Sequence, residues 1–197
     1  MLPGVILAAG DSTRMGSPKA LLLTRDGRPF VAAIAETFAA AGITEIVVVT
    51  GRDHERITAA LAHERLPAPP EVVRNLDPSR GQLSSLLLGI DSLPAAAPAA
   101  VVTLVDVPLM TAETVSLVIS EWRRTGAPIV RPAIGERHGH PVVFDRRLFQ
   151  ELRQAPLDVG AKAVFRAHAA EIVNVPVTDT GCLVDVDTPA DYEALGR

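Results

Sequence analysis

The sequence predicts an α/β protein built on one open, mostly parallel, doubly wound sheet. Three observations carry this prediction. Short β-branched runs alternate with segments of helical periodicity. Two of these runs, 45–50 and 100–105, are nearly all apolar, as is typical of strands buried on both faces of a parallel sheet. The chain has 197 residues, 48% of them hydrophobic, so a single domain over 1–197 can bury a sizeable core.

The elements are expected in the following order. Pro29 suits a first helical position, Gly42 a C-terminal cap and Thr111 an N-cap. In the first part of the chain we expect strands at 5–8, 45–50, 71–74 and 100–105, and helices at 29–41, 53–65, 82–93 and 111–124. The pattern then loosens, and we expect strands at 128–131, 141–144 and 172–175, helices at 145–154 and 160–168, and a short C-terminal helix.

Composition excludes several functions. Lys and Arg number 19 against 23 Asp and Glu, a net charge of −4, which argues against a nucleic-acid binder, and 4% aromatic residues provide few surfaces for stacking bases. One cysteine, Cys182, allows neither an internal disulfide nor a multi-cysteine zinc site. The N-terminus lacks the basic region of a signal peptide, and no apolar run approaches the roughly 18 residues of a membrane span. We therefore expect a cytoplasmic protein with no membrane contact.

The loop after the first strand, 7–19, carries the local cations that a phosphate ligand needs. Small residues at its start let a ligand approach backbone N–H groups, Arg14 offers a bidentate fork and Lys19 a compact charge. The loop is not a Walker A motif, because Gly10 and Gly16 are separated by five residues and Lys19 is displaced. No Gly-x-Gly-x-x-Gly occurs, so a dinucleotide-dependent oxidoreductase has little support. The alternative is a flexible turn with incidental charges; the position after a buried first strand favours a phosphate site.

The motif Leu7-Ala-Ala-Gly-x-Ser-x-Arg-Met-Gly-x-Pro-Lys19 resembles the signature of nucleotidyltransferases that make activated nucleotide conjugates. The likeness is strongest to the molybdenum cofactor cytidylyltransferases of the MobA/MocA-like NTP transferase family. Further blocks follow in the family's order, at Asn75 with 81–86, at 106–109, at 137–144 and at 185–192.

This resemblance implies a Rossmann-like nucleotidyltransferase fold and a Mg²⁺-dependent transfer of CMP from CTP to the phosphate of molybdopterin, with release of pyrophosphate. Mn²⁺ is the alternative ion. The resemblance also implies that residues 1–110 form mainly the nucleotide-binding half and residues 111–197 mainly the acceptor-binding half. The catalytic residues it implies are Arg14, Lys19 and Asp106. The nucleotide-binding residues it implies are Leu7, Ala8, Ala9, Gly10, Arg14, Lys19, Asn75, Gly81, Ser84 and Ser85.

Acidic residues at two places suit a hard cation. Asp106 follows the most apolar strand, where Pro108 ends the ladder, and the resemblance makes it a metal ligand. The alternative is a turn aspartate. The resemblance also implies a second metal aspartate in 185–192; we assign it to Asp187, with Asp185 in reserve. Here the alternative is a helix start, with Thr188 as N-cap and an acidic residue at the third helical position.

The acceptor block is 137–144. His138 and His140 lack a third zinc ligand at suitable spacing. The resemblance implies that His140 contacts the acceptor's phosphate. The alternative, a turn histidine without a ligand, is about equally expected. Asp158 and Lys162 are the other acceptor-binding residues that the resemblance implies. Relatives usually carry arginine at the position of Lys162 and glycine at that of Leu157, so the acceptor of this protein can differ from theirs.

The choice of nucleotide depends on Ala9, since guanylyl-transferring relatives usually carry glycine there and cytidylyl-transferring ones alanine. The alternatives are a guanylyltransferase, a sugar-1-phosphate nucleotidyltransferase of the same fold, and a non-catalytic partner that inserts cofactor into a molybdoenzyme apo-protein. Arg14, Lys19 and Asp106 together disfavour the last, because a pure binder would not need all three.

Overall fold

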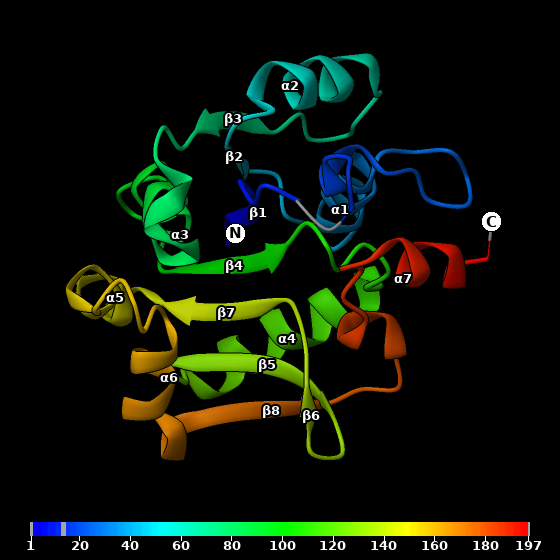
Figure 1. Ribbon diagram of the computed structural model, residues 1–197. Coiled ribbons are helices and arrows are strands. Elements are labelled where there is room, and N and C mark those ends of the chain that lie inside the picture. Colours follow the sequence, from blue (N-terminus) through cyan, green and yellow to red (C-terminus); the bar gives the residue numbers. More distant parts are fainter. Residues whose placement is uncertain (1, 13–14, 197) are drawn as a thin grey trace.

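One sheet of eight strands runs through the part of the chain that the computed structural model describes, residues 2–12 and 15–196. Its order is β3-β2-β1-β4-β7-β5-β6, with β8 paired to β5 (Figure 1). The strands are β1 (Gly4–Ala8), β2 (Ile46–Thr50), β3 (Glu71–Arg74), β4 (Ala99–Leu104), β5 (Ile129–Ile134), β6 (Arg137–His138), β7 (Val142–Asp145) and β8 (Ile172–Pro176). Strands β3, β2, β1 and β4 are mutually parallel, as are β5 and β8, whereas β7 is antiparallel to β4 and β5. The predicted mostly parallel sheet is confirmed.

Helices cover both faces of the sheet. Helices α1 and α4 pack on one face, and α3, α5 and α6 lie over the other (Figure 1). The helices are α1 (Phe30–Ala40), α2 (His54–His63), α3 (Gln82–Asp91), α4 (Ala112–Thr125), α5 (Phe149–Gln154), α6 (Lys162–Ala167) and α7 (Pro189–Ala194). None of the helices in the described ranges is both long and apolar enough to cross a membrane.

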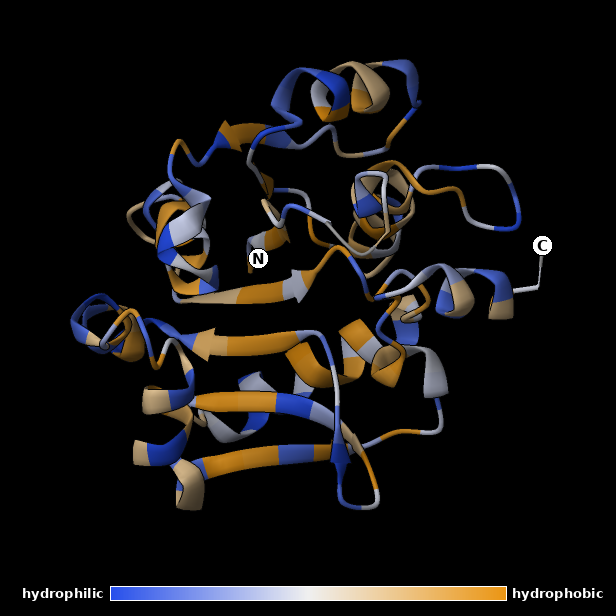
Figure 2. Cartoon of the chain, viewed as in Figure 1, coloured by the Kyte–Doolittle hydropathy of each residue, from blue (hydrophilic) through white to orange (hydrophobic). Residues whose placement is uncertain are grey.

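Strand β1 shows why the central strands lack polar alternation. Ile6 and Ala8 belong to the core under α1 and α4, and Val5 and Leu7 belong to the core under α3, α5 and α6. Because successive side chains point to opposite faces, a strand covered on both sides is apolar throughout. Figure 2 shows β4 and β7 as mainly hydrophobic, whereas β5 and β8 are interrupted by hydrophilic segments.

Two of the three terminal predictions are confirmed, whereas Pro29 was expected at the first helical position and is the N-cap of α1, with an extended ψ of 140°. Thr111 precedes α4, and its Oγ1 accepts a hydrogen bond from the Thr114 N–H at 3.2 Å. Gly42, just beyond α1, has φ +85°, a conformation that glycine adopts at little cost.

Three elements differ from the sequence prediction. The helix expected over 145–154 begins only at Phe149, because Arg146–Leu148 form a 3-10 turn that Asp145 caps. Strand β5 continues through Pro132 to Ile134, where we expected an end at Arg131. The missing N–H of Pro132 is tolerated because the pairing of β7 with β5 stops at Val130. The block around residue 137 was expected to be a glycine turn, but it also forms the two-residue strand β6.

Candidate functional site

A first cavity of about 250 Å³ opens where β1 and β4 end. The residues predicted to bind nucleotide at 7–10 line it, together with Ser12. The end of β2 passes close to this loop: a Cβ at Gly51 would lie 2.6 Å from the Ala9 carbonyl oxygen, so glycine is required there. Arg14 lies outside the described residues, and its assigned role stays a prediction.

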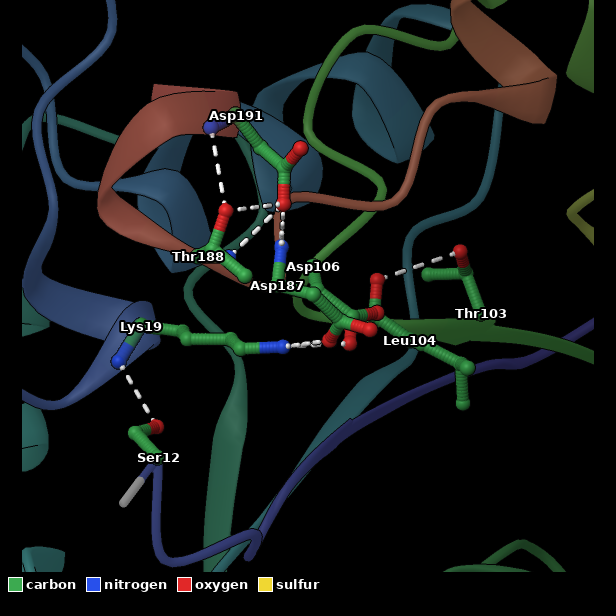
Figure 3. Close-up of polar contacts among 8 residues, drawn as sticks. All are labelled: Ser12, Lys19, Thr103, Leu104, Asp106, Asp187, Thr188 and Asp191. Carbon is green, nitrogen blue, oxygen red and sulfur yellow. Dashed lines mark hydrogen bonds and ion pairs between the residues drawn. The ribbon is translucent and has the colours of Figure 1, made fainter. Parts of the chain in front are cut away.

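Lys19 joins two carboxylates in this cavity, as Figure 3 shows. Its Nζ lies 3.0 Å from Asp106 Oδ2 and 2.5 Å from Asp187 Oδ1, and its backbone N–H donates to Ser12 Oγ at 3.0 Å. Burial alone would lower the pKa of Lys19, but the hydrogen bonds to Asp187 and Asp106 raise it above its ordinary value. The ammonium is therefore charged at neutral pH and neutralises part of the acidic pair.

One oxygen of Asp106, a residue that lines the cavity, has no partner in the described part of the chain. Its Oδ1 is buried and has no hydrogen-bond partner among the described residues, whereas Oδ2 contacts Lys19. An orphaned buried carboxylate oxygen is costly unless a cation or donor meets it. No cluster of three or more His, Cys, Asp and Glu side chains in the described ranges could hold a metal alone. Two carboxylates nevertheless fit Mg²⁺ or Mn²⁺ ions that take their remaining ligands from water and substrate phosphates.

Asp185 and Asp187 differ in their surroundings. Asp187 lines the cavity beside Lys19, and Asp185 does not line it. Burial, followed by the nearby charges of Asp106 and Asp187, raises the pKa of Asp185 above its ordinary value. All three carboxylates are thus close enough to interact, and Asp187 is the better placed to hold an ion with Asp106.

The backbone of Asp187 is fixed by the start of α7. Its N–H donates to Asp191 Oδ2 at 3.1 Å, and Thr188 and Asp191 form a reciprocal capping box, visible in Figure 3. The predicted helix cap is confirmed, and it positions the side chain that reaches Lys19, while the assignment of Asp187 as a metal ligand stays a prediction.

The start of α3 forms another wall. Gly81 has φ +89°, and Gly81 and Ser85 line the first cavity. Asn75 is buried, and its Nδ2 donates to Ser84 Oγ and Ser85 Oγ, each at 2.9 Å. Asn75 and Ser84 do not line the cavity. Both were predicted to bind nucleotide, which stays a prediction; in this structure they hold the first turn of α3 in place.

A second cavity of about 460 Å³ adjoins the first and shares Leu7, Gly81, Gln82 and Leu104 with it. The three predicted acceptor-binding residues, His140, Asp158 and Lys162, all line it. The structure therefore brings the acceptor set together in one cavity, next to the cavity that holds Lys19 and Asp106.

His140 is neutral in this environment. Burial lowers its pKa to about 4, against the opposing effect of the Asp106 charge. Its backbone N–H donates to the Cys182 carbonyl at 2.9 Å, which ties the acceptor block to the segment that leads to Asp187. A neutral imidazole can donate or accept one hydrogen bond, but it does not store a proton for delivery at neutral pH.

Several lining residues were not predicted from the sequence. Arg52 and Asp53 line the first cavity and follow β2, so their place after a parallel strand was an available signal. Arg131 and Phe165 line the second cavity from β5 and α6. Neither follows a strand end or belongs to a known motif, and only the packing of α6 over β5 brings them to the cavity.

The family model described as the MobA-like NTP transferase domain matches residues 4–172 of the chain. Among characterised proteins, the nicotine blue oxidoreductase of Paenarthrobacter nicotinovorans is 33% identical over 193 residues, covering 94% of this chain and 91% of that protein.

Solved structures are similar over nearly the whole chain. Rv0371c from Mycobacterium tuberculosis H37Rv has a TM-score of 0.82 at 27% identity, covering 99% of this chain and 97% of that one. The structure of its complex with manganese has a TM-score of 0.77 at 27% identity, covering 98% of this chain and 97% of that one. A nucleotidyl transferase from Methanothermobacter thermautotroptrophicus gives 0.81 with 99% and 95% coverage, but its 21% identity shows a shared fold alone.

Proposed function

The chain belongs to the family of MobA-like NTP transferase domains, and from this premise we propose that it is a divalent-metal-dependent nucleotidyltransferase. The observation that carries the proposal is the trio of Lys19, Asp106 and Asp187 in a cavity at the sheet edge, with one Asp106 oxygen unpartnered among the described residues. A manganese complex of the similar Rv0371c supports the use of a divalent ion.

The proposed reaction needs no covalent enzyme intermediate. A phosphate oxygen of the acceptor attacks the α-phosphorus of a nucleoside triphosphate, the bond to the bridging oxygen breaks, and pyrophosphate leaves as the diphosphate linkage forms. Cys182 is not a nucleophile for such a step, because it is buried and burial raises the pKa of its thiol to about 11. Positioning and charge neutralisation account for the catalysis.

Each group of the first cavity has a place in this reaction. Asp106 and Asp187 would hold the metal ion, which when bound neutralises charge on phosphate oxygens. Lys19 lines the same cavity and would contact the phosphates, with Arg14 as its partner. The backbone at 8–10 would face the nucleotide, and Ser85 would contact its base or ribose.

For the substrates we propose CTP and a molybdopterin-type phosphate acceptor, with Mg²⁺ as the ion. The support is the resemblance of the motifs and the alanine at position 9. The halves 1–110 and 111–197 would then serve mainly nucleotide and acceptor, although Asp187 from the second half lines the nucleotide cavity. Calorimetry with CTP, GTP, ATP and UTP in the presence of Mg²⁺ tests this choice. We expect CTP to bind most tightly; a preference for GTP would overturn the assignment.

A second candidate function is favoured by one finding, the 33% identity to nicotine blue oxidoreductase over almost the full length of both proteins. On this alternative the two adjoining cavities would hold a hydride donor and a reducible organic substrate. The two functions differ in their products. Nucleotidyl transfer releases pyrophosphate, whereas reduction oxidises a reduced nicotinamide dinucleotide and releases no pyrophosphate.

A further inference from the structure

The second cavity contains an arginine that its surroundings orient but do not neutralise. Arg131 Nε donates to Asn174 Oδ1 at 2.9 Å, and its guanidinium carbon lies 5.6 Å from the centre of the Phe165 ring. These contacts fix the plane of the guanidinium. Its two Nη groups have no hydrogen-bond partner among the described residues.

Among the described residues, six other arginines pair with carboxylates, whereas Arg131, which lines the second cavity, does not. Within the described ranges, carboxylates pair with Arg28, Arg56, Arg74, Arg124, Arg147 and Arg153. Arg131 is in none of the ion pairs found there, although it is half-buried and burial lowers its pKa. A partly desolvated cation that lacks a carboxylate has donors available for a ligand.

The charges around Arg131 favour an anion. Lys162 adds a second cation to the cavity wall, and Asp158 is the one carboxylate among the described lining residues. His138 adds no cation, since burial, followed by the Arg131 charge, lowers its pKa below the ordinary histidine value.

Apart from Gln82 and the two histidines, the rest of the wall is apolar. Leu83, Leu86 and Phe144 face the cavity from α3 and β7, and Phe165 meets Phe144 edge to ring with the centroids 5.5 Å apart. A cavity of about 460 Å³ with such a wall accommodates an apolar, ring-containing body.

Arg131 is not at the reacting end of this cavity. Strand β5 lies two strands from β4, roughly 10 Å away at about 4.8 Å per strand. The registers place Arg131 level with Val102, whereas Asp106 lies beyond the end of β4. A ligand group on Arg131 is therefore separate from a phosphate that reacts beside Asp106.

We propose that the second cavity binds a ring-containing, largely apolar acceptor that carries an anionic group at the end away from its reacting phosphate, and that Arg131 selects this acceptor by binding that group through both Nη atoms. This inference rests on the proposed nucleotidyl transfer for the identity of the ligand as an acceptor, and it does not depend on that acceptor being molybdopterin. The binding of an anionic, ring-containing probe at Arg131 can be measured without turnover.

The experiment measures fluorescence titrations with two probes of similar ring structure, the anionic 8-anilinonaphthalene-1-sulfonate and the uncharged N-phenyl-1-naphthylamine. Wild type is compared with Arg131→Met, Arg131→Lys and Arg123→Met. Arg123 is exposed on α4, over the opposite face of the sheet, so it provides the same substitution outside the cavity. Thermal unfolding checks that each variant is folded.

We expect Arg131→Met to weaken the Kd for the sulfonate at least about tenfold, because a bidentate charge-assisted contact is lost. The sulfonate Kd of Arg131→Lys should fall between those of wild type and Arg131→Met, and that of Arg123→Met should match wild type. The neutral probe should bind all four proteins with the same Kd. A sulfonate Kd within twofold of wild type in Arg131→Met overturns the inference, as does an equal loss for the neutral probe.

Turnover separates this inference from the proposed function. If wild type releases pyrophosphate with an acceptor, Arg131→Met should raise the KM for that acceptor while kcat and the KM for the nucleotide stay within about twofold. If wild type releases none, the proposed function fails, and the probe titrations still decide whether Arg131 is an anion site.

Discussion

At the scale of single residues, the charge of the first cavity is set by one lysine between two aspartates. Lys19, Asp106 and Asp187 come from the loop after β1, the end of β4 and the segment before α7. Lys19 compensates two carboxylates that would otherwise repel each other in a partly enclosed space. A divalent ion held by the same carboxylates would share them with this ammonium, since Lys19 contacts Asp106 through Oδ2 and leaves Oδ1 without a partner among the residues described.

The carboxylates should contribute unequally to catalysis. We predict that Asp106→Asn and Asp187→Asn each lower metal-dependent pyrophosphate release by 10² or more, on the order expected when one electrostatic contact to the transition state is removed. Asp185→Asn, which alters a carboxylate outside the cavity lining, should cost less than about tenfold. Initial rates with saturating nucleotide check this order. Wild-type turnover by Asp106→Asn would contradict the metal assignment.

Lys19, Asp106 and Asp187 could be predicted as site residues because each belongs to a recognisable motif, although 168 positions separate Lys19 from Asp187. Asn75 could not be placed in the same way. Its amide was assigned to the nucleotide, but it is buried against two serines of α3, and sequence does not reveal which polar partner a buried amide finds. Arg131 was missed since nothing in a strand interior distinguishes a ligand-binding arginine from a solvated one.

At the scale of elements, the predicted strands and helices before residue 125 all occur, with ends that differ by at most two residues. Apolar periodicity and capping residues specify these elements locally. The antiparallel direction of β7 and the short β6 were not specified in this way, because they depend on which strands the later segments pair with. Two contacts between elements lead to testable predictions.

Asp179 anchors the N-terminus of α4. Its Oδ2 accepts hydrogen bonds from Thr111 N at 2.8 Å, Thr111 Oγ1 at 3.0 Å and Thr114 Oγ1 at 2.8 Å. We predict that Asp179→Ala lowers the free energy of unfolding by about 1–2 kcal/mol, and that Asp179→Asn, which keeps an acceptor oxygen, lowers it by less. Urea denaturation measures the difference. Equal stability of the alanine variant and wild type would rule out this anchoring role.

His168 links α6 to α5 through carboxylates. Its Nε2 lies 2.7 Å from Glu151 and its Nδ1 2.8 Å from Glu171, and these hydrogen bonds raise its pKa. A raised pKa in the folded state stabilises the protein fully below the unfolded value near 6.5. This stabilisation is lost as the pH rises through the folded-state pKa.

The pH dependence of stability should therefore change when His168 is replaced. We predict that His168→Gln is less stable than wild type at pH 5.5 and that the difference shrinks towards pH 8.5, as measured by thermal unfolding. His63→Gln is the matched control, because His63 is exposed and contacts the Ala59 carbonyl rather than a carboxylate. A difference that grows with pH would have the wrong sign and refute the role of the charged imidazole.

At the scale of the whole molecule, an acidic chain concentrates a few cations in two adjoining cavities, as the proposed binding of phosphates requires. The net charge of −4 excludes an extended anion-binding face, but it does not describe the two cavities. One holds Lys19 beside carboxylates suited to a divalent ion, and the other holds Arg131 and Lys162. The first cavity draws on residues from both ends of the chain, so the proposed metal and nucleotide sites would depend on the complete fold.

The central claim is that this fold transfers a nucleotide rather than a hydride, and parallel product assays test it most directly. Wild-type protein with Mg²⁺ is given each nucleoside triphosphate with molybdopterin, a sugar 1-phosphate or no acceptor, and pyrophosphate is quantified. In matched reactions NADH or NADPH replaces the triphosphate and its oxidation is followed. We predict acceptor-dependent pyrophosphate release, greatest with CTP and molybdopterin, and no oxidation of either dinucleotide. Oxidation of NADH or NADPH with no pyrophosphate from any triphosphate would contradict the account.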